Sequence, residues 1–160
     1  MERVTASKIN KCAATMAELR SVFPRFYFLS NAEMVRVIED PTPRTVSKFV
    51  NRMFEGVASL VLDDENADVV VGLRAENGEE LKFGRMVNSA KKGLRGQAAK
   101  WLLKVEYQMR FSLSVQLEES FTAYKNLVDS DAYFEWIRQF PTQIILSLVH
   151  MICHQLSCLL

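Results

Sequence analysis

The hydrophobic positions in the N-terminal third of the chain follow a helical period that is interrupted twice. Apolar residues three or four positions apart predict helices over residues 4–22, 31–39 and 43–54. Ser30 and Glu33 have the spacing of a capping box, in which the serine oxygen accepts from the amide three residues on and the glutamate bonds back. We therefore expect the second helix to begin sharply after the serine.

The third of these helices has a sequence signal at each end. Thr42 precedes Pro43, a pair in which threonine serves as the N-cap and proline occupies the first turn. Gly56 follows the last apolar position and is typical of a helix end. These signals predict one continuous helix over residues 43–54.

The pattern changes at Val57, where β-branched apolar runs alternate with turn residues. The runs predict strands over residues 57–62, 69–75 and 80–83. Asn77-Gly78 is the stronger of the two turn signals, because both residue types tolerate positive φ. The segment from about 57 to 83 is therefore predicted to be a three-stranded antiparallel meander, which needs another element to cover one face.

The C-terminal half returns to a helical period. A long apolar stripe predicts a helix over residues 95–127, and shorter helices are predicted over 131–139 and 142–157, on either side of Pro141. The stripe consists of Ala98, Trp101, Leu102, Val105, Met109, Leu113, Leu117, Phe121 and Tyr124. The predicted fold class is mostly α, a helical bundle or rod segment with an inserted three-stranded antiparallel β-meander. Residues 1–160 are expected to form a single partial domain.

One aromatic segment fits neither a helical nor a strand period. It consists of Phe23, Pro24, Arg25, Phe26, Tyr27 and Phe28. Because Pro24 ends one helix and a capped helix follows, the segment is predicted to be a corner. Its three phenylalanines are expected to wedge between packed helices, and Arg25 to hold helix C-terminal carbonyls or a carboxylate. The alternative is a docking surface, and packing is favoured over it.

Composition narrows the class of protein. Hydrophobic residues make up 49% of the chain, charged residues 24%, and the net charge is +1, which is typical of a globular domain and argues against broad nucleic-acid binding. Three cysteines do not make a disulfide framework, so a reducing intracellular setting is favoured. The uncharged segment from Thr142 to Leu160 is too short and too interrupted to predict a membrane span.

The sequence contains no strong catalytic or cofactor-binding motif. The sequence holds no phosphate-binding loop, and its glutamate pairs are not organised for acid–base catalysis. His150, Cys153, His154 and Cys158 share a face of the last helix at metal-ligand spacing, but ordinary helix packing is the favoured interpretation. Trp101 and Trp136 lie on apolar faces, where core roles are favoured over interface roles. We therefore predict no enzyme, cofactor or metal.

The order of four motifs carries the interpretation further. These motifs are FPRFYFLSNAEMVRVIED, MFEGVASLVLDDENADVVVGLRAENGEELKF, KWLLKVEYQMRFSL and YFEWIRQFPTQIIL. From about Arg20 to Leu146 the chain resembles the ring-proximal part of the linker region of dynein heavy chains. The Trp101-Leu102 and Val105-Glu106 pairs match a signature of the long helix, and Trp136 matches the segment that leads to the first ATPase module.

The resemblance implies a mechanical function. In that family the linker is a largely helical rod that lies across a ring of ATPase modules and bends as they cycle. By resemblance, the partners are the ring modules and other dynein subunits, with microtubules reached only indirectly and with no nucleic acid or membrane. The expected location is cytoplasmic and cytoskeleton-associated, in a dynein complex, or in a ciliary axoneme. The sequence Leu29-Ser30-Asn31 favours the ciliary type.

The chain also departs from the family pattern. Phe140 stands where the family usually has a second tryptophan, and the pattern is lost after Leu146. We therefore expect a fragment, a truncated chain or a degenerate copy, without ATPase or motor activity of its own. Two other hypotheses stay open at this point: a helical adaptor that binds protein partners and is unrelated to a motor, and a metal- or cysteine-based enzyme built on the last helix.

Overall fold

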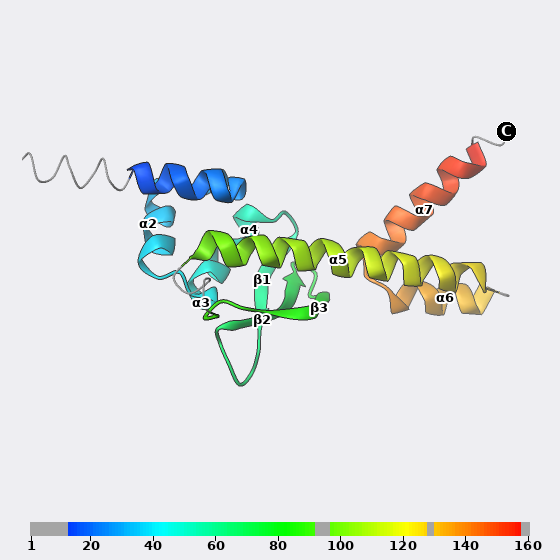
Figure 1. Ribbon diagram of the computed structural model, residues 1–160. Coiled ribbons are helices and arrows are strands. Elements are labelled where there is room, and N and C mark those ends of the chain that lie inside the picture. Colours follow the sequence, from blue (N-terminus) through cyan, green and yellow to red (C-terminus); the bar gives the residue numbers. More distant parts are fainter. Residues whose placement is uncertain (1–12, 92–96, 128–129, 158–160) are drawn as a thin grey trace, which may run out of the picture. The chain divides into compact units, whose positions relative to one another are not determined.

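A computed structural model describes residues 13–91, 97–127 and 130–157 (Figure 1). It is mostly helical, with one three-stranded antiparallel sheet, which confirms the predicted fold class. The chain divides into two compact units, Met1–Gln108 and Met109–Leu160, and each is described here by itself. Helix α5 (Ala98–Lys125) contributes residues to both units. The single domain over residues 1–160 stays a prediction.

Short helices form the N-terminal part of the first unit. Residues 13–22 are helical, and the earlier part of the helix predicted over 4–22 lies outside the described residues. The elements that follow are η1 (Pro24–Phe28), α2 (Asn31–Glu39), α3 (Pro43–Val46), η2 (Ser47–Phe49) and α4 (Val50–Met53). Helix α2 has the predicted bounds.

The capping box at the start of α2 is confirmed. The Glu33 amide donates to Ser30 Oγ at 3.4 Å, while the Ser30 amide and hydroxyl each donate to Glu33 Oε2 at 2.8 Å. The hydrogen bond from the Ser30 amide is the first cause that lowers the pKa of the Glu33 carboxyl. Arg52 of α4 adds an ion pair to this carboxylate at 3.1 Å.

The helical segment predicted over residues 43–54 is present to residue 53, but it is not one regular α-helix. The structure has two short α-helical turns, α3 and α4, separated by the 3₁₀ turn η2. The Ser47 hydroxyl oxygen accepts from the Leu60 amide at 3.0 Å, so this segment is bonded to the neighbouring strand. Thr42 occupies the N-cap position without a side-chain cap. Instead, the hydroxyl of Thr45 donates to Asp40.

The sheet follows α4 directly. Strands β1 (Val57–Leu62), β2 (Val69–Ala75) and β3 (Glu80–Asn88) pair antiparallel in the order β1-β2-β3. Strand β3 continues five residues past the predicted end at 83. At the tight turn only Gly78 has positive φ, at 88°, while the Gly78 amide donates to Ala75 O at 3.1 Å. This arrangement is a turn with a glycine bulge rather than two left-handed residues.

A second irregularity lies in the middle of the β2–β3 pair. Val70 pairs with Val87 and Gly72 pairs with Lys82, so the four residues 83–86 of β3 lie opposite the single residue 71. Next to this bulge, a Cβ placed on Gly72 would lie 2.5 Å from the backbone oxygen of Leu81. The close approach of the two strands therefore requires glycine at this position.

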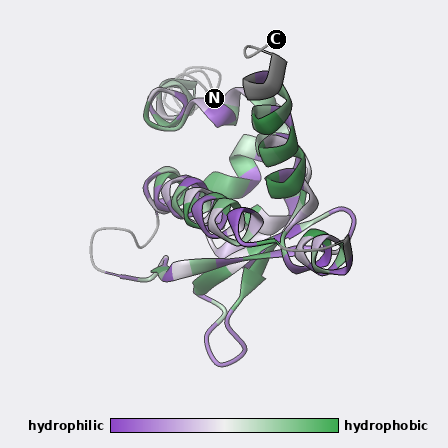
Figure 2. Cartoon of the chain, turned by 90° about the vertical axis from the view of Figure 1, so that its right-hand side faces the viewer, coloured by the Kyte–Doolittle hydropathy of each residue, from purple (hydrophilic) through white to green (hydrophobic). Residues whose placement is uncertain are grey.

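The second unit consists of the C-terminal part of α5 with α6 (Ser130–Gln139) and α7 (Thr142–Ser157). Trp136, Ile145 and Leu148 form its buried core. Figure 2 shows α7 as a largely hydrophobic helix. Even so, no helix in the described part of the chain is both long enough and apolar enough to span a membrane.

Candidate interaction site

The aromatic corner is built on a buried aromatic pair. Phe23 has an extended backbone, as expected of a residue before proline, and Pro24 begins the 3₁₀ turn η1. This turn places Phe23 and Phe26 fully inside the first unit, with ring centroids 5.0 Å apart in an edge-to-face arrangement. The Phe54 ring lies 6.2 Å from that of Phe23. The predicted wedge is therefore present for these two phenylalanines.

The other two aromatics of the corner face outward. Tyr27 is 70% exposed and Phe28 is 64% exposed, so the prediction that Phe28 wedges between helices is wrong. A 3₁₀ turn has three residues per turn, so Phe23 and Phe26 share one side of it and the two residues after Phe26 point elsewhere. The guanidinium of Arg20 lies 5.6 Å from the centroid of the Tyr27 ring. Tyr27 and Phe28 thus form an exposed aromatic pair on the corner.

Arg25 connects three segments of the first unit. Its Nη1 donates to the backbone oxygen of Met53, the last residue of α4, at 2.9 Å. Its Nη2 donates to the Glu106 carboxylate of α5 at 3.3 Å, and the guanidinium lies 4.6 Å from the centroid of the Phe54 ring. The side chains of Arg25 and Glu106 are 31% and 17% exposed, so this charge-assisted contact is partly shielded from solvent. Both kinds of partner expected from the sequence, a helix C-terminal carbonyl and a carboxylate, are present.

Trp101 anchors α5 in the first unit. Its side chain is fully buried, and the indole Nε1 donates to the backbone oxygen of Pro41 at 3.1 Å. Pro41 lies in the connection between α2 and α3. The tryptophan therefore satisfies a loop carbonyl while filling the core between this loop and the long helix.

Trp136 is the buried tryptophan of the second unit. It is 2% exposed, and its Nε1 donates to the backbone oxygen of Ser120 at 3.0 Å. The rings of Tyr124 and Tyr133 lie 5.6 and 5.5 Å from that of Trp136. A hydrogen bond with Tyr124 is the first cause that raises the pKa of the Tyr133 hydroxyl. Both tryptophans are thus packed within their units.

The metal-ligand pattern on α7 is not assembled into a site. His150, Cys153 and His154 are all exposed, and Cys158 lies outside the described residues. Among residues 13–91, 97–127 and 130–157, no group of three or more histidine, cysteine or acidic side chains lies close enough to hold a metal ion. Nothing in this part of the chain carries the enzyme hypothesis further.

Sequence reasoning missed a second apolar stripe on α5. Leu103 is 40% exposed and Tyr107 is 64% exposed, on a face other than the one that buries Trp101. Their spacing of four residues was the available signal. Further along the helix, Ser112 and Ser120 are buried, whereas Leu113 and Leu117 of the predicted stripe are only half-buried.

Comparisons with known proteins agree on one family. The family described as "Dynein heavy chain, N-terminal region 2" matches residues 6–120. The cytoplasmic dynein heavy chain of Drosophila melanogaster is 32% identical over 86% of this chain, and that of Dictyostelium discoideum is 30% identical over 91%. Dynein axonemal heavy chain 12 of Mus musculus is 32% identical over 86% of the chain.

The matched region is a small part of each relative. The aligned segment covers 3% of the Drosophila and Dictyostelium proteins and 4% of the mouse protein. Within the family match lie the aromatic corner, the sheet and Trp101, whereas Trp136 follows its last residue. Arg25 and Glu106, which contact each other, both lie within the residues of the family match.

Proposed function

This chain belongs to the dynein heavy chain family, and on that premise we propose that it is a mechanical linker segment of such a heavy chain. Its function is then to transmit an ATP-driven conformational change within a microtubule-based motor. A lever must carry force without absorbing it, so its elements need dense and redundant connections. No catalytic residue is required for this task.

The single observation that supports this proposal most is the set of contacts made by Arg25. One guanidinium joins the aromatic corner to the end of α4 and to the long helix α5. The buried Phe23–Phe26 pair and the Phe54 ring lie against the same junction. Because the contacts come from different segments, bending at the corner would break several of them together.

The exposed aromatic pair is the proposed contact with other parts of the motor. Tyr27 and Phe28 present large apolar surfaces on the outside of the stiff corner, where ATPase modules of the ring or other dynein subunits could dock. Microtubules would be reached only through the rest of the motor. Cytoplasmic and axonemal relatives are both 32% identical, so we propose cytoskeletal association without a choice between the two.

The chain alone is proposed to have no ATPase or motor activity. The test is phosphate release from ATP by the purified chain, compared with buffer and with a chain inactivated by heat. Turnover that stays with the protein through further purification would contradict the proposal.

The proposed function is tested by a chimera. In the Dictyostelium cytoplasmic dynein heavy chain, the segment that aligns with residues 6–120 of this chain, the range of the family match, is replaced by those residues. Microtubule gliding close to that of the parent motor is the expected result. A chimera that hydrolyses ATP normally but does not move microtubules would favour the adaptor hypothesis instead.

A further inference from the structure

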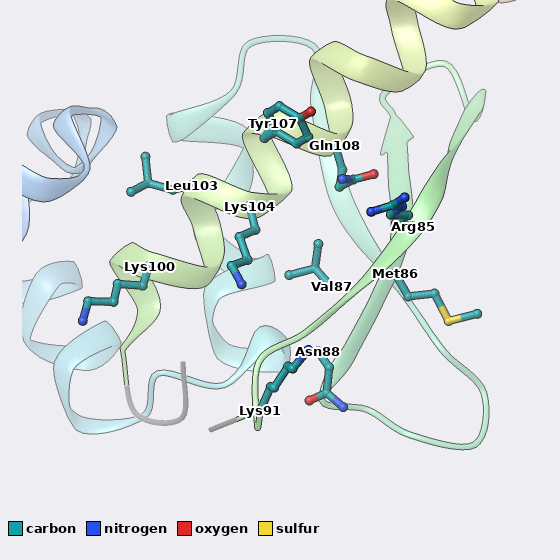
Figure 3. A pocket seen from close by; sticks show the side chains of 10 residues that line it. All are labelled: Arg85, Met86, Val87, Asn88, Lys91, Lys100, Leu103, Lys104, Tyr107 and Gln108. Carbon is teal, nitrogen blue, oxygen red and sulfur yellow. The ribbon is translucent and has the colours of Figure 1, made fainter. Parts of the chain in front are cut away.

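An open groove lies in the first unit between β3 and the N-terminal part of α5 (Figure 3). Its volume is about 720 Å³. One wall is formed by Arg85, Met86, Val87 and Asn88, and the other by Lys100, Leu103, Lys104, Tyr107 and Gln108, with Lys91 at one end. The groove does not include the aromatic corner or the contacts of Arg25.

The groove is strongly cationic. Arg85, Lys91, Lys100 and Lys104 all line it and are exposed, and none of its ten lining residues within the described part of the chain is acidic. In that part of the chain none of these four side chains forms an ion pair. Lys100 and Lys104 also stand four residues apart on α5, a spacing at which like charges destabilise a helix. An anionic partner would relieve this repulsion.

One buried group in the groove needs a hydrogen-bond donor. Gln108 is 9% exposed, and its Oε1 is buried without a hydrogen-bond partner. Figure 3 shows this side chain pointing from α5 toward the β3 wall. Leaving a buried acceptor unpaired is unfavourable, because the oxygen has lost its hydrogen bonds to water and gained none in the protein. A ligand that offered an N–H group at this point would supply the missing hydrogen bond.

The bulge in β3 shapes the other wall. Residues 83–86 leave the regular ladder with β2, and Arg85 and Met86 of this bulge line the groove. Figure 3 shows Arg85 and Val87 on the side of β3 that faces α5, whereas Met86, which is 68% exposed, points away from the helix. Bulges commonly re-aim side chains in this way next to functional sites.

We propose that this groove binds an acidic peptide segment of a partner protein. Its carboxylates pair with Lys100, Lys104 and Arg85, and a backbone N–H donates to Gln108 Oε1. The proposal does not depend on the lever function, because it concerns a different surface of the first unit.

The features of the groove favour a peptide over other anions. Inorganic phosphate and sulfate match the cations, but their oxygens chiefly accept hydrogen bonds, whereas Gln108 Oε1 needs a donor. Single-stranded nucleic acid is usually held by several stacking aromatics along an extended basic track. This groove has one aromatic side chain, Tyr107, and the whole chain has a net charge of only +1.

The test is fluorescence anisotropy of the full chain with a short labelled peptide of glutamates interrupted by leucine and tyrosine. The matched probe has glutamine in place of every glutamate. We expect binding of the acidic probe that weakens as salt is raised, and about tenfold weaker binding of the glutamine probe. Equal binding of the two probes would overturn the proposal. Affinity for oligothymidylate equal to that for the acidic probe would also overturn it. Displacement of the acidic probe by phosphate, at an ionic strength where chloride does not displace the probe, would overturn it as well.

Two variants separate this site from general electrostatics. The double variant Lys100→Glu/Lys104→Glu should weaken acidic-probe binding by about tenfold or more. The control Arg44→Glu/Lys82→Glu makes the same change in net charge at exposed positions outside the groove and should have little effect. Equal losses in the two double variants would contradict a localised site.

The Gln108 contact has its own readout. Gln108→Met keeps the length of the side chain and removes the buried acceptor, so the free chain should unfold at the same temperature or a higher one. Binding of the acidic probe should nevertheless weaken about fivefold. Unchanged probe affinity in this variant would overturn the assigned contact. These binding outcomes do not depend on whether the chimera described above moves microtubules.

Discussion

The guanidinium of Arg25 lies 3.3 Å from the carboxylate of Glu106, although the two residues are 81 positions apart in the chain. The contact joins the aromatic corner to the long helix, and the same side chain also bonds the last carbonyl of α4. Arginine suits this position because its planar fork can donate in two directions while its face stacks on Phe54. A lysine would supply the charge without this geometry.

Replacing Arg25 should therefore destabilise the first unit. We expect Arg25→Ala to lower the free energy of unfolding by about 1–3 kcal/mol, because the Met53 carbonyl and Glu106 each lose a partner and the Phe54 ring loses a stacked cation. Arg25→Lys should recover only part of this loss. Urea unfolding followed by circular dichroism measures both changes.

Arg44→Ala is the matched control for this measurement. Arg44 is exposed on α3 and should change the free energy of unfolding by less than about 0.5 kcal/mol. If Arg25→Ala were as mild as this control, Arg25 would not hold the corner.

Gly72 should not tolerate a side chain. A Cβ at this position meets the Leu81 carbonyl oxygen at 2.5 Å, so Gly72→Ala would force β2 and β3 apart. We expect a loss of about 1–3 kcal/mol in the free energy of unfolding, as is typical of overpacking. The control is Gly78→Asn, since asparagine accepts positive φ and nothing lies within 4 Å of a Cβ there. Equal effects of the two substitutions would contradict the strand register.

The capping box should make stability depend on acidic pH. Hydrogen bonds from Ser30 lower the pKa of Glu33, so the ionised carboxylate stabilises the folded state. This contribution is fully present above the unfolded-state pKa and is lost as pH falls through the lower folded-state value. We expect the thermal unfolding midpoint to decrease as the pH is lowered beyond about 4. This decrease should be less steep in Glu33→Gln. If the thermal midpoint of the unaltered chain and that of Glu33→Gln depended on pH to the same degree, the capping box would not contribute to the pH dependence of stability.

Trp136 should dominate the stability of the second unit. Trp136→Phe removes both the indole donor to Ser120 and part of the ring contact with Tyr124, at an expected cost of about 2–3 kcal/mol. Phe134→Ala on the same helix changes a side chain that is 62% exposed and should cost far less. Near-ultraviolet circular dichroism during thermal unfolding compares the two variants. A larger effect of Phe134→Ala would contradict the described core.

Local sequence signals predicted the elements well where local energetics decides. The capping box sets the start of α2, and alternating β-branched runs set β1 and β2. They did not reveal the 3₁₀ turn η2 within the helical segment of residues 43–53. The Ser47 hydroxyl in this turn accepts from the Leu60 amide, and no pattern within the segment reveals such a distant partner.

The candidate sites were predictable only in part. The aromatic corner was visible as a dense run without a period, and Glu106 was already present in the motif of the long helix. The exposure of Phe28 was not predicted, because the sequence of this segment does not indicate a 3₁₀ turn. In such a turn Phe23 and Phe26 share one side, and Phe28 lies on another. The basic groove was missed because Arg85 and Gln108 come together only through the bulge in β3 and the packing of α5.

We propose that the corner held by Arg25 is stiff and transmits force. The most direct test is microtubule gliding velocity per ATP hydrolysed, measured in the Dictyostelium chimera with and without Arg25→Met, beside Arg44→Met as control. We expect Arg25→Met to keep microtubule-stimulated ATP turnover but to lower the distance moved per ATP by about half or more, while the control changes neither. An unchanged distance per ATP in a folded Arg25→Met chimera would contradict it.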